Sequence, residues 1–238
     1  MLIVMDIKEE IKLPERENVK IETAPHFNDK KLYTAVKRAF DVIMSSIALV
    51  ICVIPMIFVA ILVWSTSKGP ILFRQPRVGR NGKLFNCLKF RTMYITAPKA
   101  VATSELKNAS SQITKVGKFL RKTSLDELPQ FINIFRGDMS FVGPRPLIPA
   151  EKEIHTLRYS YGVYNIRPGI TGWAQVNGRD RVSARDKAKL DKYYYDNRSV
   201  LLDLKILFIT VPRVLFGADI VEGKRAKEEK KKTENKAK

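Results

Sequence analysis

The longest hydrophobic pattern in the chain is a run of apolar and small residues at positions 42–64 that contains no charged side chain. A helix over this run is about 33 Å long, which matches the hydrocarbon core of a bilayer. Buried helices of soluble proteins are rarely this apolar over such a length. The pattern therefore predicts a membrane-embedded helix, with Tyr33 and Trp64 suited to the interface.

Charges on both sides of the run bear on whether the helix crosses the membrane. Pro55, near its middle, removes one helical hydrogen bond and clashes with the carbonyl of Ile51. We interpret residues 32–66 as a re-entrant helix with its hinge at Pro55, and a kinked single span is the alternative. The flanking residues that favour the cytoplasmic side at both ends are Lys30, Lys31, Lys37, Arg38, Lys68, Arg74, Arg77 and Arg80.

Asp41 stands at the start of the run, where an unpaired carboxylate is costly. Lys37 lies one helical turn earlier and Arg38 three residues earlier, so either side chain could pair with it. We expect these three residues to anchor the helix at the membrane interface.

Patterns beyond residue 66 predict an α+β fold, a mostly helical cytoplasmic domain with a small β-hairpin. The hairpin covers residues 71–90 and turns at an Asn-Gly pair at 81–82. Helices are predicted at 114–121, 131–135, 151–161 and 183–196, and 166–179 is predicted as a glycine-punctuated loop. Residues 200–211 are too short and too charged to span a bilayer, so they lie in the interface as an amphipathic helix or pack in the core.

The chain therefore divides into four parts. Residues 1–31 are expected to form a poorly ordered leader, and 32–66 the membrane helix. Residues 67–218 form the globular domain, and 219–238 are a basic, disordered tail.

Charge changes the picture by pointing to an anionic partner. The chain has 43 Lys and Arg against 24 Asp and Glu, a formal net charge of +19. Nucleic acid, acidic phospholipid and a phosphorylated substrate all fit this balance. Cys52 and Cys87 give neither a disulfide framework nor metal-ligand spacing, which favours a reducing compartment.

Two adjacent carboxylates, Asp126 and Glu127, are the strongest candidates for chemistry. Acidic groups set among basic ones suggest a site for phosphate and a metal ion. The alternative is helix capping, because Ser124 and Glu127 have the spacing of a capping box and Asp126 could be an N-cap. The flanking cations are Lys115, Lys118, Arg121, Lys122, Arg136 and Arg145.

Further cations are candidate anion ligands. Arg145 is held between Pro144 and Pro146, which limits its backbone freedom and suits a pre-positioned ligand, although a surface arginine in an ordinary turn is the alternative. Lys89 and Arg91 would share one face of a strand, which could equally be a solvated face. The loop at 166–179 offers backbone NH groups, a stacking ring and cations to a nucleotide, and its candidate ligands are Arg167, Gln175, Asn177 and Arg179.

These segments together resemble the bacterial sugar transferases, the monotopic polyprenyl-phosphate phosphoglycosyl transferases. The resemblance covers residues 33–216 and matches the small, single-domain form. It is carried by KRAFD at 37–41, GP at 69–70, FRQ at 73–75, KFRTM at 89–93, SLDEL at 124–128, GDMSFVGPRP at 137–146 and RPGITGWAQVNGR at 167–179.

The resemblance implies transfer of a sugar-1-phosphate from a UDP-sugar to polyprenyl (undecaprenyl) phosphate, with release of UMP, as the first membrane step of a surface glycan pathway. It implies Asp126 as the nucleophile of a covalent intermediate, Glu127 as its dyad partner, Arg145 as a phosphate ligand and Mg²⁺ as cofactor, for which both acids are candidate ligands. It also implies a catalytic domain on the cytoplasmic face of the inner membrane, phospholipid contact and a possible homodimer.

One position departs from the family pattern. The family often has serine before the hinge proline, where its hydroxyl can satisfy a freed carbonyl, and this chain has Ile54. The expected break at Pro55 is therefore shallower or closed by another donor.

A second class of function is a non-catalytic, membrane-tethered scaffold or nucleic-acid-binding protein that uses its basic face. The uninterrupted run at 42–64 and the lack of a dense basic stripe interleaved with aromatic residues count against it. We therefore expect no nucleic-acid partner.

Overall fold

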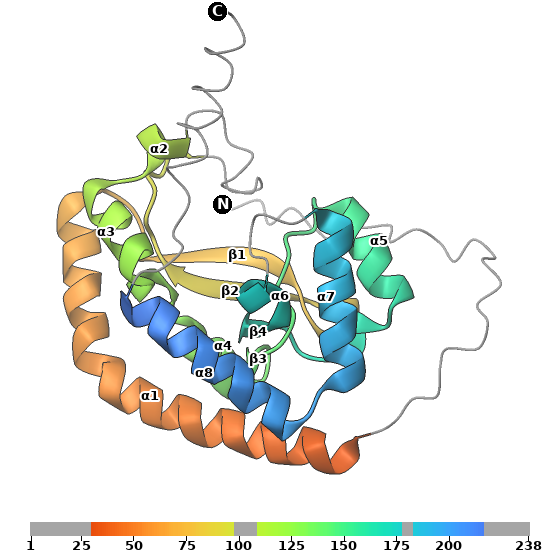
Figure 1. Ribbon diagram of the computed structural model, residues 1–238. Coiled ribbons are helices and arrows are strands. Elements are labelled where there is room, and N and C mark those ends of the chain that lie inside the picture. Colours follow the sequence, from red (N-terminus) through yellow and green to blue (C-terminus); the bar gives the residue numbers. More distant parts are fainter. Residues whose placement is uncertain (1–29, 98–108, 178–182, 217–238) are drawn as a thin grey trace, which may run out of the picture.

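The computed structural model describes residues 30–97, 109–177 and 183–216, and Figure 1 shows their arrangement. Almost all of the predicted leader and the whole of the predicted basic tail lie outside the described residues. Arg179 also lies outside them. The fold is α+β, as predicted, with a long N-terminal helix beside a mostly helical domain that contains a β-hairpin.

Helix α1, Lys31–Thr66, contains the apolar run and has Pro55 in its interior. Within the described residues it is the one helix long and apolar enough to cross a membrane. The helix is bent rather than interrupted, since Figure 1 shows it changing direction partway while it remains helical throughout. An interior proline is a common cause of such a bend.

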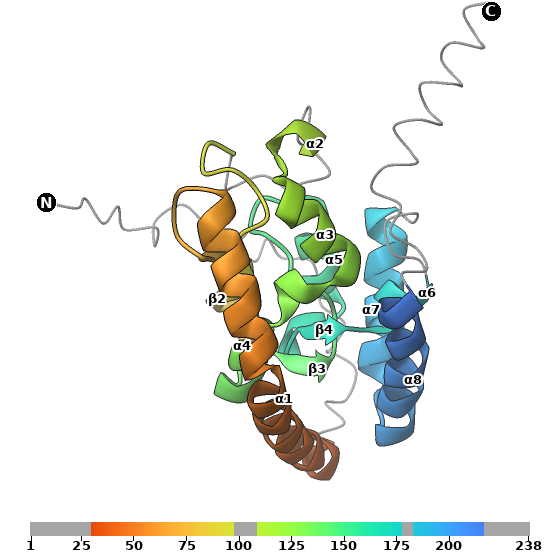
Figure 2. The ribbon, with the colours of Figure 1, turned by 90° about the vertical axis from the view of Figure 1, so that its left-hand side faces the viewer.

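Both halves of α1 contact the same globular domain. In the first half, the Arg38 guanidinium donates to the carbonyls of Ile134 and Phe135, each at 2.7 Å. In the second half, α1 lies beside α3, as Figure 2 shows, and the two helices share a hydrophobic cluster. The buried residues of this cluster are Val59, Val63, Phe90 and Leu120.

The predicted hairpin is present. Strands β1, Leu72–Val78, and β2, Leu84–Phe90, are antiparallel, with Phe73 opposite Lys89. The turn is a short 3-10 segment, Arg80–Gly82, in which Asn81 has a φ of 58° and Gly82 a φ of 72°. Asn and Gly accept these angles at low cost, which is why the pair marks the turn.

The helices that follow the hairpin lead to the carboxylates. After the short helix α2, Ala109–Gln112, helix α3 covers Lys115–Thr123, with the Thr114 hydroxyl accepting from the Gly117 amide as predicted for its N-cap. A Cβ at Gly117 would lie 2.0 Å from the Thr92 carbonyl oxygen, so glycine allows α3 to approach the end of the hairpin. Helix α4, Gln130–Arg136, ends at Gly137 with a φ of 91°.

The segment predicted as a glycine loop forms regular structure instead. Strand β4, Gly169–Thr171, pairs in parallel with β3, Ser140–Val142, and the short helix α6, Trp173–Asn177, follows it. The partner strand lies about thirty residues earlier, so no local pattern in 166–179 could reveal the pairing.

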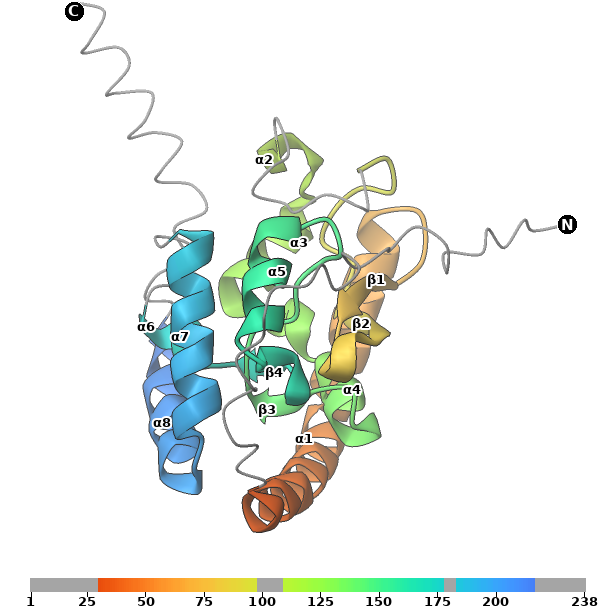
Figure 3. The ribbon, with the colours of Figure 1, turned by 90° about the vertical axis from the view of Figure 1, so that its right-hand side faces the viewer.

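The last helices complete the domain. Helices α5, Lys152–Ser160, and α7, Ala184–Asn197, lie side by side, as Figures 1 and 3 show, and the 3-10 segment Val163–Asn165 follows α5. For helix α8, Val200–Phe216, the structure supports packing in the core, and the interfacial alternative stays a prediction. One face is in the core, where Ile206 is fully buried, while Leu201 and Phe208 on the other face are about four-fifths exposed, at 79% and 82%.

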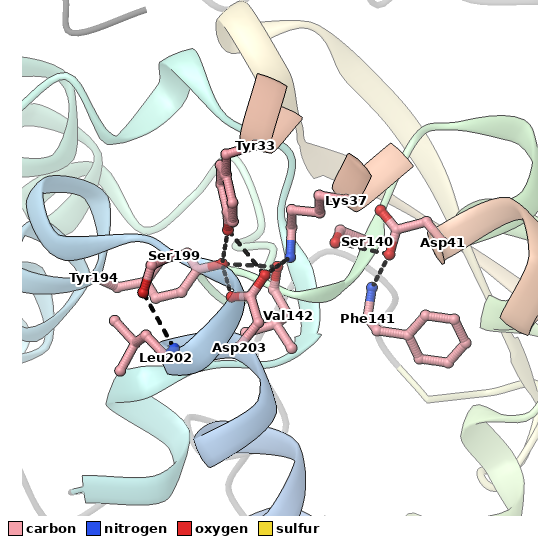
Figure 4. Close-up of polar contacts among 10 residues, drawn as sticks. All are labelled: Tyr33, Lys37, Asp41, Ser140, Phe141, Val142, Tyr194, Ser199, Leu202 and Asp203. Atoms are coloured by element: carbon pink, nitrogen blue, oxygen red, sulfur yellow. Dashed lines mark hydrogen bonds and ion pairs between the residues drawn. The ribbon is translucent and has the colours of Figure 1, made fainter. Parts of the chain in front are cut away.

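The start of α1 is attached to the domain by polar contacts that differ from the predicted ones (Figure 4). Lys37 does not serve Asp41 as its ion-pair partner but binds the Asp203 carboxylate of α8, with Nζ and Oδ2 2.6 Å apart. Asp41 is buried and accepts from the Ser140 hydroxyl and the Phe141 amide, both at 3.0 Å. These three anchor residues therefore join α1 to the domain, because their partners lie 96 or more residues away in the sequence.

Candidate active site

Asp126 and Glu127, here called the carboxylate pair, lie in a short connection between α3 and α4. Ser124 ends α3 in the left-handed region, with a φ of 57°, and Leu125–Glu127 forms one 3-10 turn. Leu125 and Leu128 pack against the cluster shared by α1 and α3. The two leucines therefore fix the turn to the core beside α1.

Helix capping does not explain the carboxylate pair. The Ser124 side chain makes no capping hydrogen bond, so the capping box is not formed. The N-cap of α4 is Pro129 rather than Asp126, and it also has no side-chain cap. The two acids are thus available for other interactions.

The two carboxylates have opposite electrostatic environments. Asp126 is 7% exposed, and this burial raises the pKa of its carboxyl to about 6; the positive charge of Lys89 opposes the shift and the negative charge of Glu127 adds to it. Burial would also raise the pKa of Glu127, but the charges of Lys89 and Arg145 outweigh it and hold that pKa well below its usual range. Glu127 is therefore ionised at neutral pH, while Asp126 titrates near pH 6.

Lys89 is the ion-pair partner of Glu127. Its Nζ lies 2.5 Å from Glu127 Oε1, and both side chains are about one-quarter exposed, at 22% and 24%. Arg145 is exposed, and its charge acts on Glu127. The structure thus brings together four of the predicted residues: Asp126, Glu127, Lys89 and Arg145.

Arg77, which the sequence predicts only as a cation flanking the apolar run, also acts on the carboxylate pair. Its charge lowers the pKa of Glu127, and its Nη1 donates to the Pro146 carbonyl at 3.0 Å. In the hairpin register, residues 73, 75 and 77 lie opposite 89, 87 and 85, so Arg77 shares one face with Lys89. The alternation of side chains between the two faces of the predicted hairpin is the sequence signal that places Arg77 on the same face as Lys89.

Arg121, which the sequence predicts only as a flanking charge, is a second cation that acts on the carboxylate pair. Its positive charge opposes the raised pKa of Asp126, and its Nε donates to the Thr92 hydroxyl at 2.9 Å. The close approach of α3 at Gly117 brings the helix to Thr92 and so places this arginine.

The other predicted ligands have different surroundings. Arg91 is buried, and its Nη2 donates to the Ser67 carbonyl at 2.6 Å at the end of α1, so it does not share the position of Lys89. Arg167 donates to the Gly137 carbonyl at 2.8 Å, and exposed Asn177 donates to the Trp173 carbonyl at 2.9 Å. Gln175 has both terminal amide atoms buried without a protein partner. Arg91 and Arg167 thus each contact a carbonyl at the end of a helix.

The donor set fits a magnesium ion that is shared with a phosphorylated substrate. Among the described residues, no group of three or more His, Cys, Asp or Glu side chains could enclose a metal. Mg²⁺ in phosphate-transfer sites usually takes one or two carboxylates and completes its shell with phosphate oxygens and water. The carboxylate pair supplies that number of protein ligands.

The raised pKa of Asp126 predicts that Asp126→Asn stabilises the fold. A carboxyl with a folded-state pKa of about 6 and an unfolded value near 3.8 favours folding below pH 3.8, and this contribution is lost as pH rises through 6. Above pH 7, Asp126→Asn should therefore be more stable than the wild type by about 3 kcal/mol, and the gap should narrow toward pH 4. Thermal melts in EDTA across this range measure it, and a constant gap would contradict it.

Comparison with known proteins finds relatives that match most of this chain. A model of the family described as bacterial sugar transferase matches residues 32–217. An undecaprenyl-phosphate glucose phosphotransferase of Komagataeibacter xylinus is 39% identical over 191 residues, which cover 76% of this chain and 36% of the relative. The UDP-glucose:undecaprenyl-phosphate glucose-1-phosphate transferase of Escherichia coli (strain K12) is 42% identical over 182 residues, 74% of this chain and 39% of the relative.

A shorter relative matches along most of its length. EpsL of Bacillus subtilis (strain 168), named an uncharacterized sugar transferase, is 42% identical over 185 residues, 77% of this chain and 89% of the relative. This chain thus spans less than two-fifths of the two longer relatives, and nearly all of the shorter one.

Proposed function

This chain belongs to the bacterial sugar transferase family, and we propose that it transfers a sugar-1-phosphate from a UDP-sugar to polyprenyl phosphate, releasing UMP. The observation that carries the proposal is the carboxylate pair, in which a buried acid with raised pKa adjoins an ionised acid held by Lys89. The names of the two longer relatives support this reaction type. Its product, a lipid-linked sugar diphosphate, suits the first membrane step of a surface glycan pathway.

In the first step, an Asp126 oxygen attacks the β-phosphorus of the UDP-sugar. A bond forms between this oxygen and phosphorus, the bond to the bridging oxygen breaks, and UMP leaves with that oxygen. The carboxylate needs no base, because at pH 7 to 8 most Asp126 is ionised. The raised pKa also makes this oxygen more basic than an exposed aspartate, which favours attack.

In the second step, a phosphate oxygen of polyprenyl phosphate attacks the phosphorus of the sugar-phosphoryl aspartate. The new phosphoanhydride bond forms, the bond to Asp126 breaks, and the free carboxylate returns. Polyprenyl phosphate is largely ionised near pH 7, so this step also needs little base catalysis. One site can serve two large substrates because they react in turn.

The cations of the site reduce the repulsion between an anionic nucleophile and a diphosphate. Arg145 is exposed and faces solvent, which suits a phosphate ligand. Lys89, Arg77 and Arg121 add fixed positive charge around the carboxylate pair, which stabilises charge that builds on the phosphoryl oxygens. Asp126 and Glu127 would hold Mg²⁺, which when bound supplies further charge neutralisation at the diphosphate.

We also propose that α1 is re-entrant and that the domain lies on the cytoplasmic face. A straight 36-residue helix would be about 54 Å long, yet both halves of the bent helix contact one domain. A spanning helix would carry one half away to the other side. Residues that contact lipid in this arrangement include Ile51, Ile54 and Phe58, which are 69%, 75% and 62% exposed.

Cysteine labelling tests this arrangement. Leu32 is exposed at the start of α1, and Lys68 is exposed just beyond its end. Leu32→Cys and Lys68→Cys in a Cys52→Ser, Cys87→Ser background provide single labels. In intact cells, neither should react with a membrane-impermeant maleimide, and both should react in inverted vesicles. Labelling of the two positions from opposite sides would show a single span.

The proposed reaction is tested with a panel of UDP-sugars. The protein in nanodiscs, with undecaprenyl phosphate and Mg²⁺, should release UMP from at least one of them, and EDTA should stop the release. Absence of UMP with every UDP-sugar would favour the non-catalytic scaffold.

A further inference from the structure

The turn that carries Arg145 is fixed by its backbone carbonyls. Two prolines flank Arg145, so the turn is poor in backbone donors, and its order depends on the groups that reach its oxygens. Five successive carbonyls each accept a hydrogen bond. The pairs are Pro144 from the Gly169 amide (2.9 Å), Arg145 from Arg158 Nη1 (2.7 Å), Pro146 from Arg77 Nη1 (3.0 Å), Leu147 from the Val78 amide (3.0 Å) and Ile148 from the Glu151 amide (3.1 Å).

Arg158 is the group that holds the carbonyl of Arg145 itself. It comes from α5 and is 3% exposed. Its Nε and Nη2 donate to one oxygen of Asp191, on α7, at 2.9 and 2.5 Å. A guanidinium is planar and rigid, so fixing two of its nitrogens on Asp191 also fixes the direction of Nη1.

The ion pair between Arg158 and Asp191 needs an explanation beyond stability. Both residues are almost fully buried, and a buried ion pair contributes little net stability compared with apolar residues of similar size. The third nitrogen of the Arg158 guanidinium, Nη1, donates to the backbone carbonyl of Arg145. A shift of this carbonyl would rotate the peptide plane after Arg145 and with it the direction of the Arg145 side chain.

We propose that Arg158 and Asp191 are positioning residues for Arg145, and that they aim its guanidinium at the substrate diphosphate. Asp191 orients Arg158, Arg158 holds the Arg145 carbonyl, and the exposed Arg145 side chain contacts phosphate. This inference rests on the proposed function, because it needs a diphosphate substrate at Arg145.

The test is a double-mutant cycle between Arg158 and Arg145. Arg158→Lys keeps a charge for Asp191 but lacks the planar fork that also reaches the carbonyl, so kcat/KM for UMP release should fall about tenfold or more. In an Arg145→Ala background, the same change should cost less than twofold. The dissociation constant for UDP, measured by calorimetry, gives a second cycle if Arg145→Ala turns over too slowly. Equal losses in both backgrounds would show a general structural role and overturn the inference.

Two further variants separate positioning from folding. Arg158→Met with Asp191→Leu removes both charges together, so the fold is retained, while kcat/KM should fall as in Arg158→Lys. Lys189→Gly, at an exposed position of the same helix as Asp191, weakens α7 without touching either charge or the Arg145 turn and should leave kcat/KM within twofold of the wild type. A folded Met/Leu variant with wild-type kcat/KM would refute the inference. A wild-type protein that releases no UMP would refute the proposed function instead.

Discussion

Asp126→Asn should abolish UMP release and prevent formation of a covalent sugar-phosphate adduct. An amide oxygen is a far weaker nucleophile than a carboxylate, and no other described carboxylate combines burial with the charges of Lys89 and Arg121 at this position. Since the same change is expected to stabilise the fold above pH 7, the loss cannot be assigned to unfolding. We expect a fall of at least about 10³-fold, toward the level left by binding and charge stabilisation alone.

The measurement is a single-turnover experiment with a UDP-sugar and no polyprenyl phosphate. The wild type should release up to one UMP per active site and gain the mass of one sugar phosphate, whereas Asp126→Asn should do neither. Asp138→Asn is the matched control, because it removes a nearby carboxylate that accepts from Asn133 on α4. An Asp126→Asn protein that still forms the adduct would place the nucleophile elsewhere.

Lys89→Met should lower kcat/KM by about 10²-fold and change its pH dependence. The wild-type profile should rise through pH 6 as Asp126 ionises. Lys89 is the charge that most strongly lowers the pKa of Asp126, so its removal should move the rise to higher pH. Glu127 also loses its 2.5 Å ion-pair partner.

The pH profiles of kcat/KM for the two proteins provide the test. Lys83→Met serves as control, since Lys83 is exposed in the turn of the same hairpin. A Lys89→Met profile that rises at the wild-type pH would mean that Lys89 does not act on the nucleophile. Loss of activity without a shift would then reflect substrate binding alone.

The buried Asp126 of the carboxylate pair lowers the stability of the folded protein because of its electrostatics. A buried carboxylate destabilises the folded state at pH 7, and the surrounding cations offset this only in part. In the proposed reaction, the same imbalance would make Asp126 a reactive anion toward the diphosphate of the substrate. The active site therefore requires a rigid support, which the core cluster under Leu125 and Leu128 and the bonded turn at Arg145 supply.

Several elements could be predicted from sequence because their cause is local. The apolar run specified α1, the Asn-Gly pair specified the hairpin turn, and Thr114 specified the start of α3. Each of these depends on residues within a few positions of one another, so the pattern alone carries the information. The motif series predicts the carboxylate pair, Lys89 and Arg145 as site residues, and the structure brings these four residues together.

The tertiary structure decided the questions that depend on distant partners. Spacing alone could not exclude a capping box at Ser124 and Glu127. In the structure Ser124 makes no side-chain cap, and Glu127 binds Lys89, 38 positions away. Lys37 has the spacing to pair with Asp41, but Asp203 lies within 2.6 Å of it after a separation of 166 residues. Strand β4 was missed for the same reason, because its partner strand β3 lies about thirty residues earlier in the chain. Local propensity and spacing act over a few residues, whereas a buried charge takes whichever partner the packed chain brings within contact distance.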